Sequence, residues 1–381
     1  MLAVAALGAP GLLGPDLSAR VENLPSGAPR LALAAAVFAE TARRWGGFWS
    51  GVAKYCAHPY RRPSQARPLF WRAGNVTAID FAPGSAGPTV IAAPSLVNTS
   101  DVLDLLPGRS LMQALADAGF RPLLIDWGQP PDDACDWSVA RYVEDRLSPL
   151  LTAVRQESGA PPILMGYCMG GLLAAALAAQ RPDDIGALAL LATPWDFHAP
   201  SREAGQVVAG MATPFRRAAA ASGAVPADLL QALFFALDPT LAARKYRRFA
   251  EMDQTSEEAT LFVAMEDWVN GGPDLALPVA ETVLGDWYGR NVTARGAWRV
   301  GGRLVDNRSY PGPTLVAAPS RDRIVPQESA RAYAQGRDCG NLAMLDVDGG
   351  HVGMIVGHDA EAQLWRPLLE WLHNASACRT P

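Results

Sequence analysis

The chain has 381 residues, 49% of them hydrophobic, which is enough to bury a large core and predicts one large domain with an insertion. Its formal net charge of −5 gives no electrostatic reason to expect nucleic-acid binding. The five cysteines are odd in number and have no metal-ligand spacing, so we expect no disulfide framework, no metal site and a reducing, cytoplasmic compartment.

The beginning of the chain predicts a helical arm over residues 1–65. Within it, residues 27–57 are rich in alanine and helix-prone, and they carry four aromatic side chains. Residues 69–81 look like an edge hairpin. Residues 158–180 carry no charge, but two prolines and several glycines interrupt them, so we expect a buried strand and helix there and no membrane span.

Between residues 88 and 196 the pattern alternates between strands and helices. The predicted strands are 88–93, 121–126, 162–166 and 187–192, and the predicted helices lie near 109–118, 138–156 and 170–180. Alternation of this kind predicts a mostly parallel sheet with helices on both faces.

Gly166-Tyr167-Cys168-Met169-Gly170-Gly171 lies between a predicted strand and a predicted helix. It resembles the nucleophile elbow of α/β hydrolases, with cysteine where serine usually sits. Such a turn holds the central side chain out at the sheet edge, and its glycines let strand and helix pass closely. The other interpretation of Cys168 is a small buried thiol in a glycine-rich turn.

After residue 196 the alternation stops, and residues 200–295 have a mostly helical pattern. Strands resume at 313–318 and 342–347, and a helix at 360–373 closes the chain. These segments predict an α/β-hydrolase core over 66–196 and 305–381, with a helical cap or lid over 197–304. A cap encloses the nucleophile and excludes water, although most of its aromatic side chains would simply form its own core.

An elbow of this type needs an acid and a histidine later in the chain, in that order. Asp322 follows the apolar run 314–318, and His351 follows the run 342–347, so each lies just past a strand end. Imidazole can accept the proton of a thiol, and a carboxylate fixes the orientation of the imidazole ring. Alone, Asp322 could be an ordinary turn residue and His351 an ordinary histidine. Together they favour a catalytic triad with Cys168.

Other residues could take these roles. Asp126 follows a predicted strand, and so does Asp196 with His198. We rank Asp322 above both because only it lies in the loop between the last strands. The remaining histidines have no comparable position: His58, His358 and His373.

The oxyanion hole should use the backbone N–H that follows the nucleophile, which belongs to Met169. A second N–H should come from the loop after the strand 88–93, where Leu96 and Val97 are the candidates. The alternative is that this loop is an ordinary turn between strand and helix.

Several segments resemble the polyhydroxyalkanoate synthases, whose elbow is a lipase box that contains cysteine. Asp322-Arg323-Ile324-Val325-Pro326 resembles their acid loop, and Gly350-His351 their histidine loop. Further similar segments are 103–105, 110–111, 126–128 and 262–268. The resemblance covers roughly residues 50–375 and is greatest to the shorter synthase subunits, which work with a partner subunit.

This resemblance implies an acyltransferase that polymerises 3-hydroxyacyl-coenzyme A through an acyl thioester on Cys168, with His351 as base. Asp322 would orient His351 or help to activate the attacking 3-hydroxyl. Coenzyme A thioester would be a substrate, with no bound cofactor, and the partners would be the growing polyester and a second synthase subunit or a second copy. The protein would work at the surface of polyester granules. The sequence Gly349–Met354 departs from the usual synthase sequence, which leaves open a divergent branch with another acyl substrate, or weak polymerase activity.

The chemistry of cysteine supports such a transfer. Moving an acyl group from coenzyme A to a thiol exchanges one thioester for another and keeps the group activated, whereas serine would give a more stable ester suited to hydrolysis. Two alternatives stay open: a thioesterase, esterase or polyester depolymerase with the same triad, and a catalytically silent granule-binding protein.

Overall fold

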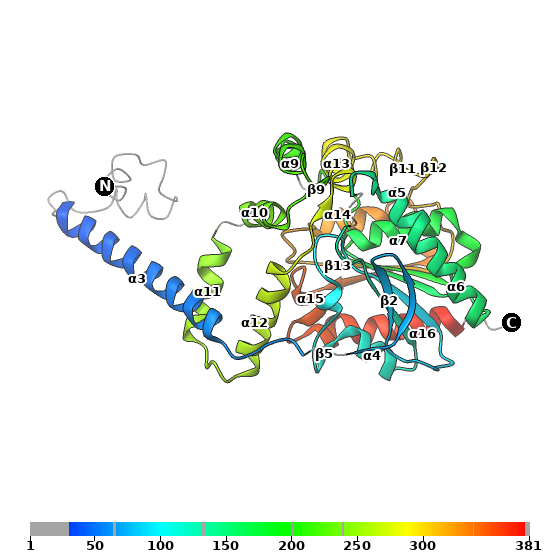
Figure 1. The fold of residues 1–381 in the computed structure, drawn as a ribbon, viewed down its shortest axis with the longest axis horizontal. Coiled ribbons are helices and arrows are strands. Elements are labelled where there is room, and N and C mark those ends of the chain that lie inside the picture. The colour runs from blue at the N-terminus through cyan, green and yellow to red at the C-terminus, as the bar shows by residue number, and fades with distance from the viewer. Residues whose placement is uncertain are drawn as a thin grey trace. The chain divides into compact units, whose positions relative to one another are not determined.

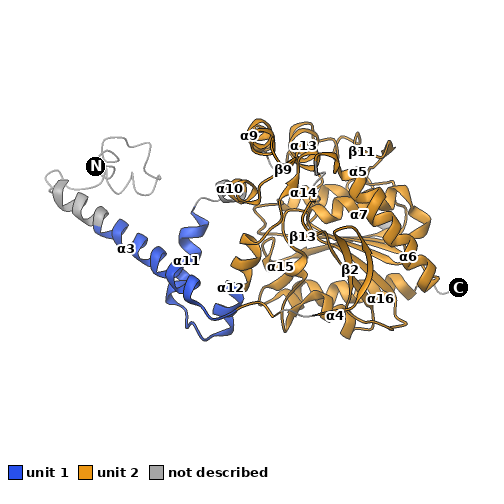
Figure 2. Cartoon of the chain, viewed as in Figure 1, with its two compact units in different colours: residues 1–60, 238–263 blue, residues 61–237, 264–381 orange. Residues whose placement is uncertain are grey.

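The computed structural model describes residues 30–63, 66–130, 134–199, 201–237, 240–337 and 339–377 (Figure 1). The chain divides into two units, Met1–Tyr60 with Asp238–Val263 and Arg61–Leu237 with Ala264–Pro381 (Figure 2). We call them unit 1 and unit 2. Residues 1–29 and 64–65 of the expected N-terminal arm lie outside the described residues, and the expected boundaries of arm, core and cap stay a prediction.

An eight-stranded sheet forms the centre of unit 2, in the order β1-β2-β6-β3-β7-β8-β13-β14. Its strands are β1 (Leu69–Ala73), β2 (Val76–Asp80), β3 (Thr89–Ala93), β6 (Arg121–Asp126), β7 (Ile163–Tyr167), β8 (Ala187–Leu191), β13 (Thr314–Pro319) and β14 (Leu342–Val347). β1 pairs with β2 and β2 with β6 in antiparallel fashion, and the other neighbours are parallel. The expected mostly parallel sheet is confirmed.

The central strands β3, β7 and β8 are buried along their whole length. They therefore consist of uninterrupted apolar runs, because a parallel strand with helices on both faces exposes neither side to water. The carboxyl ends of these strands meet at one edge of the sheet, where open α/β sheets collect functional groups.

Helices cover both faces of this sheet. Figure 1 shows α4 and α16 on one face and α6 and α7 on the other. Outside the segment between β8 and β13, the α-helices of unit 2 are α4 (Leu111–Asp117), α5 (Val139–Tyr142), α6 (Ser148–Ser158), α7 (Met169–Gln180), α14 (Gln327–Arg331), α15 (Gly353–Val356) and α16 (Arg366–Ala377). α7 carries no charge because ten of its residues are buried, which explains the uncharged stretch in the sequence. No helix in the described ranges is long and apolar enough to cross a membrane.

The helix expected over 138–156 is not a continuous α-helix. A π-helical turn at Val143–Leu147 separates α5 from α6, and a second one, Glu361–Trp365, precedes α16. Single-turn π segments insert an extra residue without changing the apolar periodicity enough to reveal them. Shorter 3₁₀ turns lie at Ser100–Leu103, Ala134–Asp136, Pro182–Asp184, Ala332–Ala334 and Cys339–Asn341.

The segment between β8 and β13 is mainly helical, as expected. It contains α8 (Arg202–Ala209), α9 (Ala212–Ala218), α10 (Ala227–Leu237), α11 (Leu241–Glu251), α12 (Glu257–Asn270), α13 (Leu277–Glu281) and a π-helix at Thr282–Gly289. Two short antiparallel ladders accompany the helices, β9 (Ala224–Val225) with β10 (Leu275–Ala276) and β11 (Arg299–Val300) with β12 (Arg303–Leu304). A third ladder joins β4 (Asp104–Leu106) to β5 (Arg109–Ser110) before α4.

In unit 1, α3 (Arg30–Ala57) packs against α11. A Cβ atom at Gly51 would lie 1.9 Å from the carbonyl oxygen of Tyr246, so only glycine allows this approach. Phe48 and Tyr55 each place an aromatic ring 5.8 Å from the ring of Tyr246. Lys54 Nζ donates a hydrogen bond to the carbonyl oxygen of Ala250. Aromatic edge contacts and a close backbone approach therefore join the two helices.

Candidate active site

Cys168 occupies a strained turn between β7 and α7, with φ 55° and ψ −127°. Its neighbours make this turn geometrically possible. A Cβ atom at Gly166 would lie 2.3 Å from the Cα of Gly171, and one at Gly170 would lie 2.0 Å from the carbonyl oxygen of Ala93. A non-glycine residue held at positive φ is a common feature of functional sites.

Asp322 and His351 lie together at the same edge of the sheet. Asp322 follows β13, His351 follows β14, and His351 Nδ1 is 2.6 Å from Asp322 Oδ2 with both side chains buried. The other carboxylate oxygen, Oδ1, accepts hydrogen bonds from the backbone N–H groups of Ile324 and Val325 at 2.8 and 2.9 Å. The carboxylate is thus held on both oxygens and fixes the orientation of the imidazole.

His351 also forms a hydrogen bond with the side chain of Cys168. Burial alone would lower the pKa of His351, but the negative charges of Cys168 and Asp322 and the hydrogen bonds to both raise it from 6.5 to about 10. The raised pKa therefore favours a protonated imidazole next to the sulfur of Cys168 at neutral pH.

Tyr167, the residue before Cys168, holds the histidine loop. Its hydroxyl donates a hydrogen bond of 3.1 Å to the backbone carbonyl of His351, and its ring centroid lies 5.1 Å from the imidazole. Burial, together with the charges of Cys168 and Asp322, raises the pKa of Tyr167 well above 10. Tyr167 therefore remains a hydrogen-bond donor. Tyr167 was not among the site residues predicted from sequence, although its position inside the elbow was a usable signal.

The expected oxyanion donors are near the thiol. Met169 is the first residue of α7, where backbone N–H groups have no partner within the helix. Met169 and Val97 line the same cavity as Cys168, whereas Leu96 is buried and is not among the residues that line it. Val97 N–H donates to Ser95 Oγ at 3.4 Å, a long hydrogen bond. Their role as donors stays a prediction.

The other candidate acids have different partners. Asp196 Oδ1 accepts hydrogen bonds from His198 N–H at 2.9 Å and from the side-chain amide of Asn291 at 2.8 Å. Asp126 Oδ1 accepts a 3.0 Å hydrogen bond from Gly128 N–H, a local turn contact. Both carboxylates therefore stabilise loops.

The remaining histidines have other surroundings. His58 Nε2 is 3.0 Å from the carbonyl oxygen of Gln254 within unit 1. His358 and His373 are exposed. Of the candidates in the sequence, the structure brings Cys168, Asp322 and His351 together.

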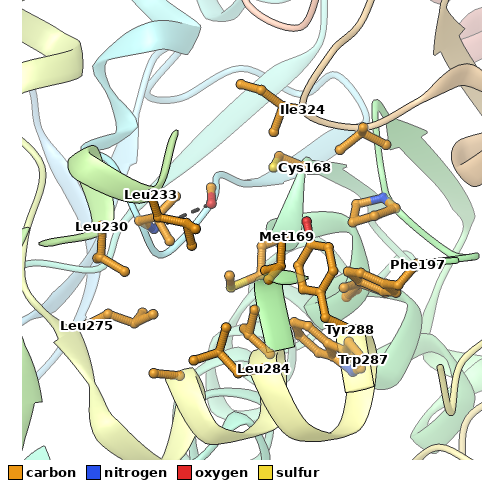
Figure 3. Close-up of a pocket in the computed structure, with 18 of the residues that line it drawn as sticks. Cys168, Met169, Phe197, Leu230, Leu233, Leu275, Leu284, Trp287, Tyr288 and Ile324 are labelled. Atoms are coloured by element: carbon orange, nitrogen blue, oxygen red, sulfur yellow. Dashed lines mark hydrogen bonds between the residues drawn. The ribbon is translucent and has the colours of Figure 1, made fainter. Parts of the chain in front are cut away.

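A cavity opens beside Cys168 and is lined mainly by apolar side chains, among them Phe197, Leu230, Leu284 and Trp287 (Figure 3). Most of them come from the helical insertion. The cavity has a volume of about 80 Å³, which is several times the roughly 10–15 Å³ that one water molecule requires. The cavity can therefore hold an apolar organic group next to the thiol. Over the described ranges, no group of three or more His, Cys, Asp or Glu residues is arranged to hold a metal ion.

Residues 88–358 match the family model described as alpha/beta hydrolase fold, and the chain belongs to this family. Among solved structures, it is similar to the monoacylglycerol lipase of Paleococcus ferrophilus, with a TM-score of 0.51 and 17% sequence identity. That similarity covers 79% of this chain and 99% of the lipase, and at this identity it shows the fold alone.

Similarity to proteins of known name is more specific about the family than similarity of fold. The chain is 28% identical over 298 residues to the poly(3-hydroxyalkanoate) polymerase subunit PhaC of Haloferax mediterranei, covering 76% of this chain and 60% of that protein. It is 26% identical over 282 residues to PhaC of Allochromatium vinosum, covering 74% of this chain and 79% of that protein. The match thus spans less than two thirds of the Haloferax subunit. These relatives confirm the resemblance to polyhydroxyalkanoate synthases.

Proposed function

We propose that this chain is the catalytic subunit of a polyhydroxyalkanoate polymerase, an acyltransferase that works through a thioester on Cys168. Its sequence similarity to PhaC subunits over about three quarters of its length carries this proposal. The contacts of His351 with both Cys168 and Asp322 support it, because they provide an activated thiol and a base.

In the first half-reaction, the Cys168 thiolate attacks the thioester carbonyl of a 3-hydroxyacyl-coenzyme A. The N–H groups of Met169 and Val97 stabilise the oxyanion that forms. The carbon–sulfur bond to coenzyme A then breaks, and the leaving thiolate takes the proton of the His351 imidazolium. The products are free coenzyme A and an acyl thioester on Cys168.

In the second half-reaction, the 3-hydroxyl of another hydroxyacyl group attacks the acyl-enzyme. His351, now neutral, accepts the hydroxyl proton, while Asp322 keeps its ring oriented. An ester forms and Cys168 leaves as thiolate, which restores the starting pair. The apolar cavity favours transfer to an alcohol because it offers water few polar partners.

The setting of this reaction follows from the same proposal. The substrates are hydroxyacyl-coenzyme A and the growing polyester, and the polymerase works at the polyester granule in the cytoplasm. Cys168 is free of any disulfide, as a nucleophile in a reducing compartment must be. A second synthase subunit or a second copy of the chain would complete the enzyme.

The purified protein incubated with 3-hydroxybutyryl-coenzyme A tests the proposal. We expect release of coenzyme A while the acyl groups are retained in polymer, measured by a thiol assay and by analysis of the acyl products. Cys168→Ala should abolish both. Cys56→Ala, which changes an exposed free cysteine, should leave both unchanged and is the matched control.

The other outcomes are equally distinct. Free hydroxyacid in a one-to-one ratio with coenzyme A would identify a hydrolase with the same triad. Unchanged coenzyme A release in Cys168→Ala would contradict the catalytic role of the thiol. Polymer that forms only after a second synthase subunit is added would identify the two-subunit type.

A further inference from the structure

The cavity beside Cys168 offers a bound acyl group very few polar contacts. Its polar lining side chains include Ser95, Cys168, Trp287 and Tyr288. Ser95 Oγ accepts a long 3.4 Å hydrogen bond from the N–H of Val97 and keeps its own proton. The indole N–H of Trp287 is fully buried, so a ligand in the cavity has no access to it. After the thiol itself, this leaves the hydroxyl groups of Ser95 and Tyr288, of which only Tyr288 belongs to the helical insertion.

Tyr288 is held firmly from two sides. It lies on the π-helix Thr282–Gly289, and its ring makes an edge contact with Phe197 at a centroid distance of 4.9 Å. His198 Nε2 lies 2.8 Å from the backbone carbonyl oxygen of Tyr288 and donates to it. Figure 3 shows the hydroxyl oxygen pointing toward Cys168. The side chain is therefore positioned to meet an acyl group on the thiol.

The hydroxyl is also available as a donor. Burial, with smaller contributions from the negative charges of Cys168 and Asp322, raises the pKa of Tyr288 to about 12. Tyr288 therefore keeps its proton throughout the physiological range. Within the part of the chain that the structure describes, its hydroxyl has no hydrogen-bond partner. An uncommitted donor in an apolar cavity is a means of recognising one oxygen atom of a ligand.

We propose that the Tyr288 hydroxyl donates a hydrogen bond to the 3-oxygen of the acyl group bound at Cys168 and thereby selects 3-hydroxyacyl over unsubstituted acyl chains. This subsite rests on the proposed function. The 3-oxygen lies only two carbon atoms beyond the thioester carbon, so it stays near the thiol while the alkyl part occupies the apolar lining. After polymerisation the same atom is an ester oxygen, which still accepts a hydrogen bond.

The size of the preference for 3-hydroxyacyl chains depends on the hydrogen bond that Tyr288 loses when an unsubstituted chain is bound. A site built to hydrogen-bond a hydroxyl group discriminates strongly against an analogue that lacks it, because a polar group of the protein then stays unpaired. Tyr288 is only partly buried, so water can restore part of the loss. We expect a preference on the order of 10- to 100-fold.

Single-turnover acylation of Cys168 tests the subsite, with coenzyme A release and the intact mass of the protein as readouts. The wild type should react about 10- to 100-fold faster with 3-hydroxybutyryl- than with butyryl-coenzyme A. Tyr288→Phe should bring this ratio close to one, because it slows the hydroxyacyl substrate and no longer leaves a donor unpaired beside the butyryl chain. Tyr333→Phe is the matched control. Burial also raises the pKa of Tyr333 to about 12, but Tyr333 does not line the cavity, so the ratio should stay that of the wild type.

A second measurement needs no variant. 3-Methoxybutyryl-coenzyme A accepts a hydrogen bond at its 3-oxygen but cannot donate one, so the wild type should still prefer it to butyryl-coenzyme A. An unchanged ratio in folded Tyr288→Phe, or equal rates for methoxybutyryl and butyryl in the wild type, would overturn the subsite. If neither butyryl nor hydroxybutyryl thioester acylates wild-type Cys168, the proposed function itself fails and the subsite with it.

Discussion

His351 lies between two acidic groups, and that position governs its proton. The charges of Cys168 and Asp322 outweigh the effect of burial and raise the pKa of His351 to about 10. A catalytic histidine normally has to collect a proton from its nucleophile during the reaction. Here the raised pKa keeps the proton on the imidazole, where in the proposed reaction it would protonate the leaving coenzyme A.

The shifted pKa predicts how stability depends on pH. Below pH 6.5 the folded and unfolded chains both hold the proton, and the stabilisation by the His351 imidazolium is complete. As pH rises from 6.5 to about 10 the unfolded chain releases the proton first, so this stabilisation is lost. Urea unfolding over this range should show wild-type stability falling by up to about 1.4 kcal/mol per pH unit more than in His351→Gln.

The matched control for this slope is His358→Gln. His358 is exposed and contacts Asp359 only at the surface, so its removal should leave the pH profile of the wild type in place. Parallel profiles for the wild type and His351→Gln would show that His351 does not hold an extra proton in the folded state.

The positions of Cys168, Asp322 and His351 could be predicted from sequence because each follows an apolar strand and the three occur in the required order. Tyr288 could not be predicted in the same way. It lies in a helical block where an aromatic residue next to Trp287 has the pattern of an ordinary core position. Its role depends on where the π-helix directs the hydroxyl, and periodicity carries no such information.

Among the elements, the β7–elbow–α7 unit leaves no room for a larger side chain at its glycines. Gly170→Ala would place a Cβ atom 2.0 Å from the carbonyl oxygen of Ala93, so helix and strand would have to move apart. We expect a loss of about 1–3 kcal/mol or more in unfolding free energy, measured in urea. Acylation of Cys168 should slow as well, because the elbow and β3 would separate.

Gly353→Ala in α15 is the control for this prediction. A Cβ atom at Gly353 meets nothing within 4 Å, so its unfolding free energy should stay within about 0.5 kcal/mol of the wild type. Equal stability of the two variants would show that the elbow has more room than the backbone distances indicate.

At the level of elements, the sheet could be predicted from the sequence because buried parallel strands are short apolar runs, as in β3, β7 and β8. The π-helical turn at Val143–Leu147 could not be predicted from the sequence, since one additional residue barely disturbs the apolar spacing. The two-residue ladder of β9 with β10 was missed for a related reason: a pair of residues has no period.

For the whole molecule, the division into two units allows their contributions to be separated. Every residue that lines the cavity belongs to unit 2, and so do Cys168, Asp322 and His351. Gly51→Ala would drive a Cβ atom into the backbone of α11. We expect faster proteolysis and hydrogen exchange in α11, while acylation of Cys168 by 3-hydroxybutyryl-coenzyme A stays within about twofold of the wild type.

Gly46→Ala on the same helix is the matched control, because a Cβ atom there meets nothing within 4 Å. It should leave the exchange of α11 unchanged or slightly slower, since alanine favours a helix over glycine. A loss of acylation in Gly51→Ala but not in Gly46→Ala would show that the chemistry in unit 2 depends on the packing of unit 1.

The buried, uncharged character of α7 also has a consequence for thermal unfolding. The thiol is attached to a strand and a helix that belong to the innermost part of the core, and such segments open only when the whole cooperative unit melts. Heating should therefore leave alkylation of Cys168 at its native rate until the main transition and then change it abruptly. The alkylation rate of this one thiol would therefore report the unfolding of the core that surrounds it.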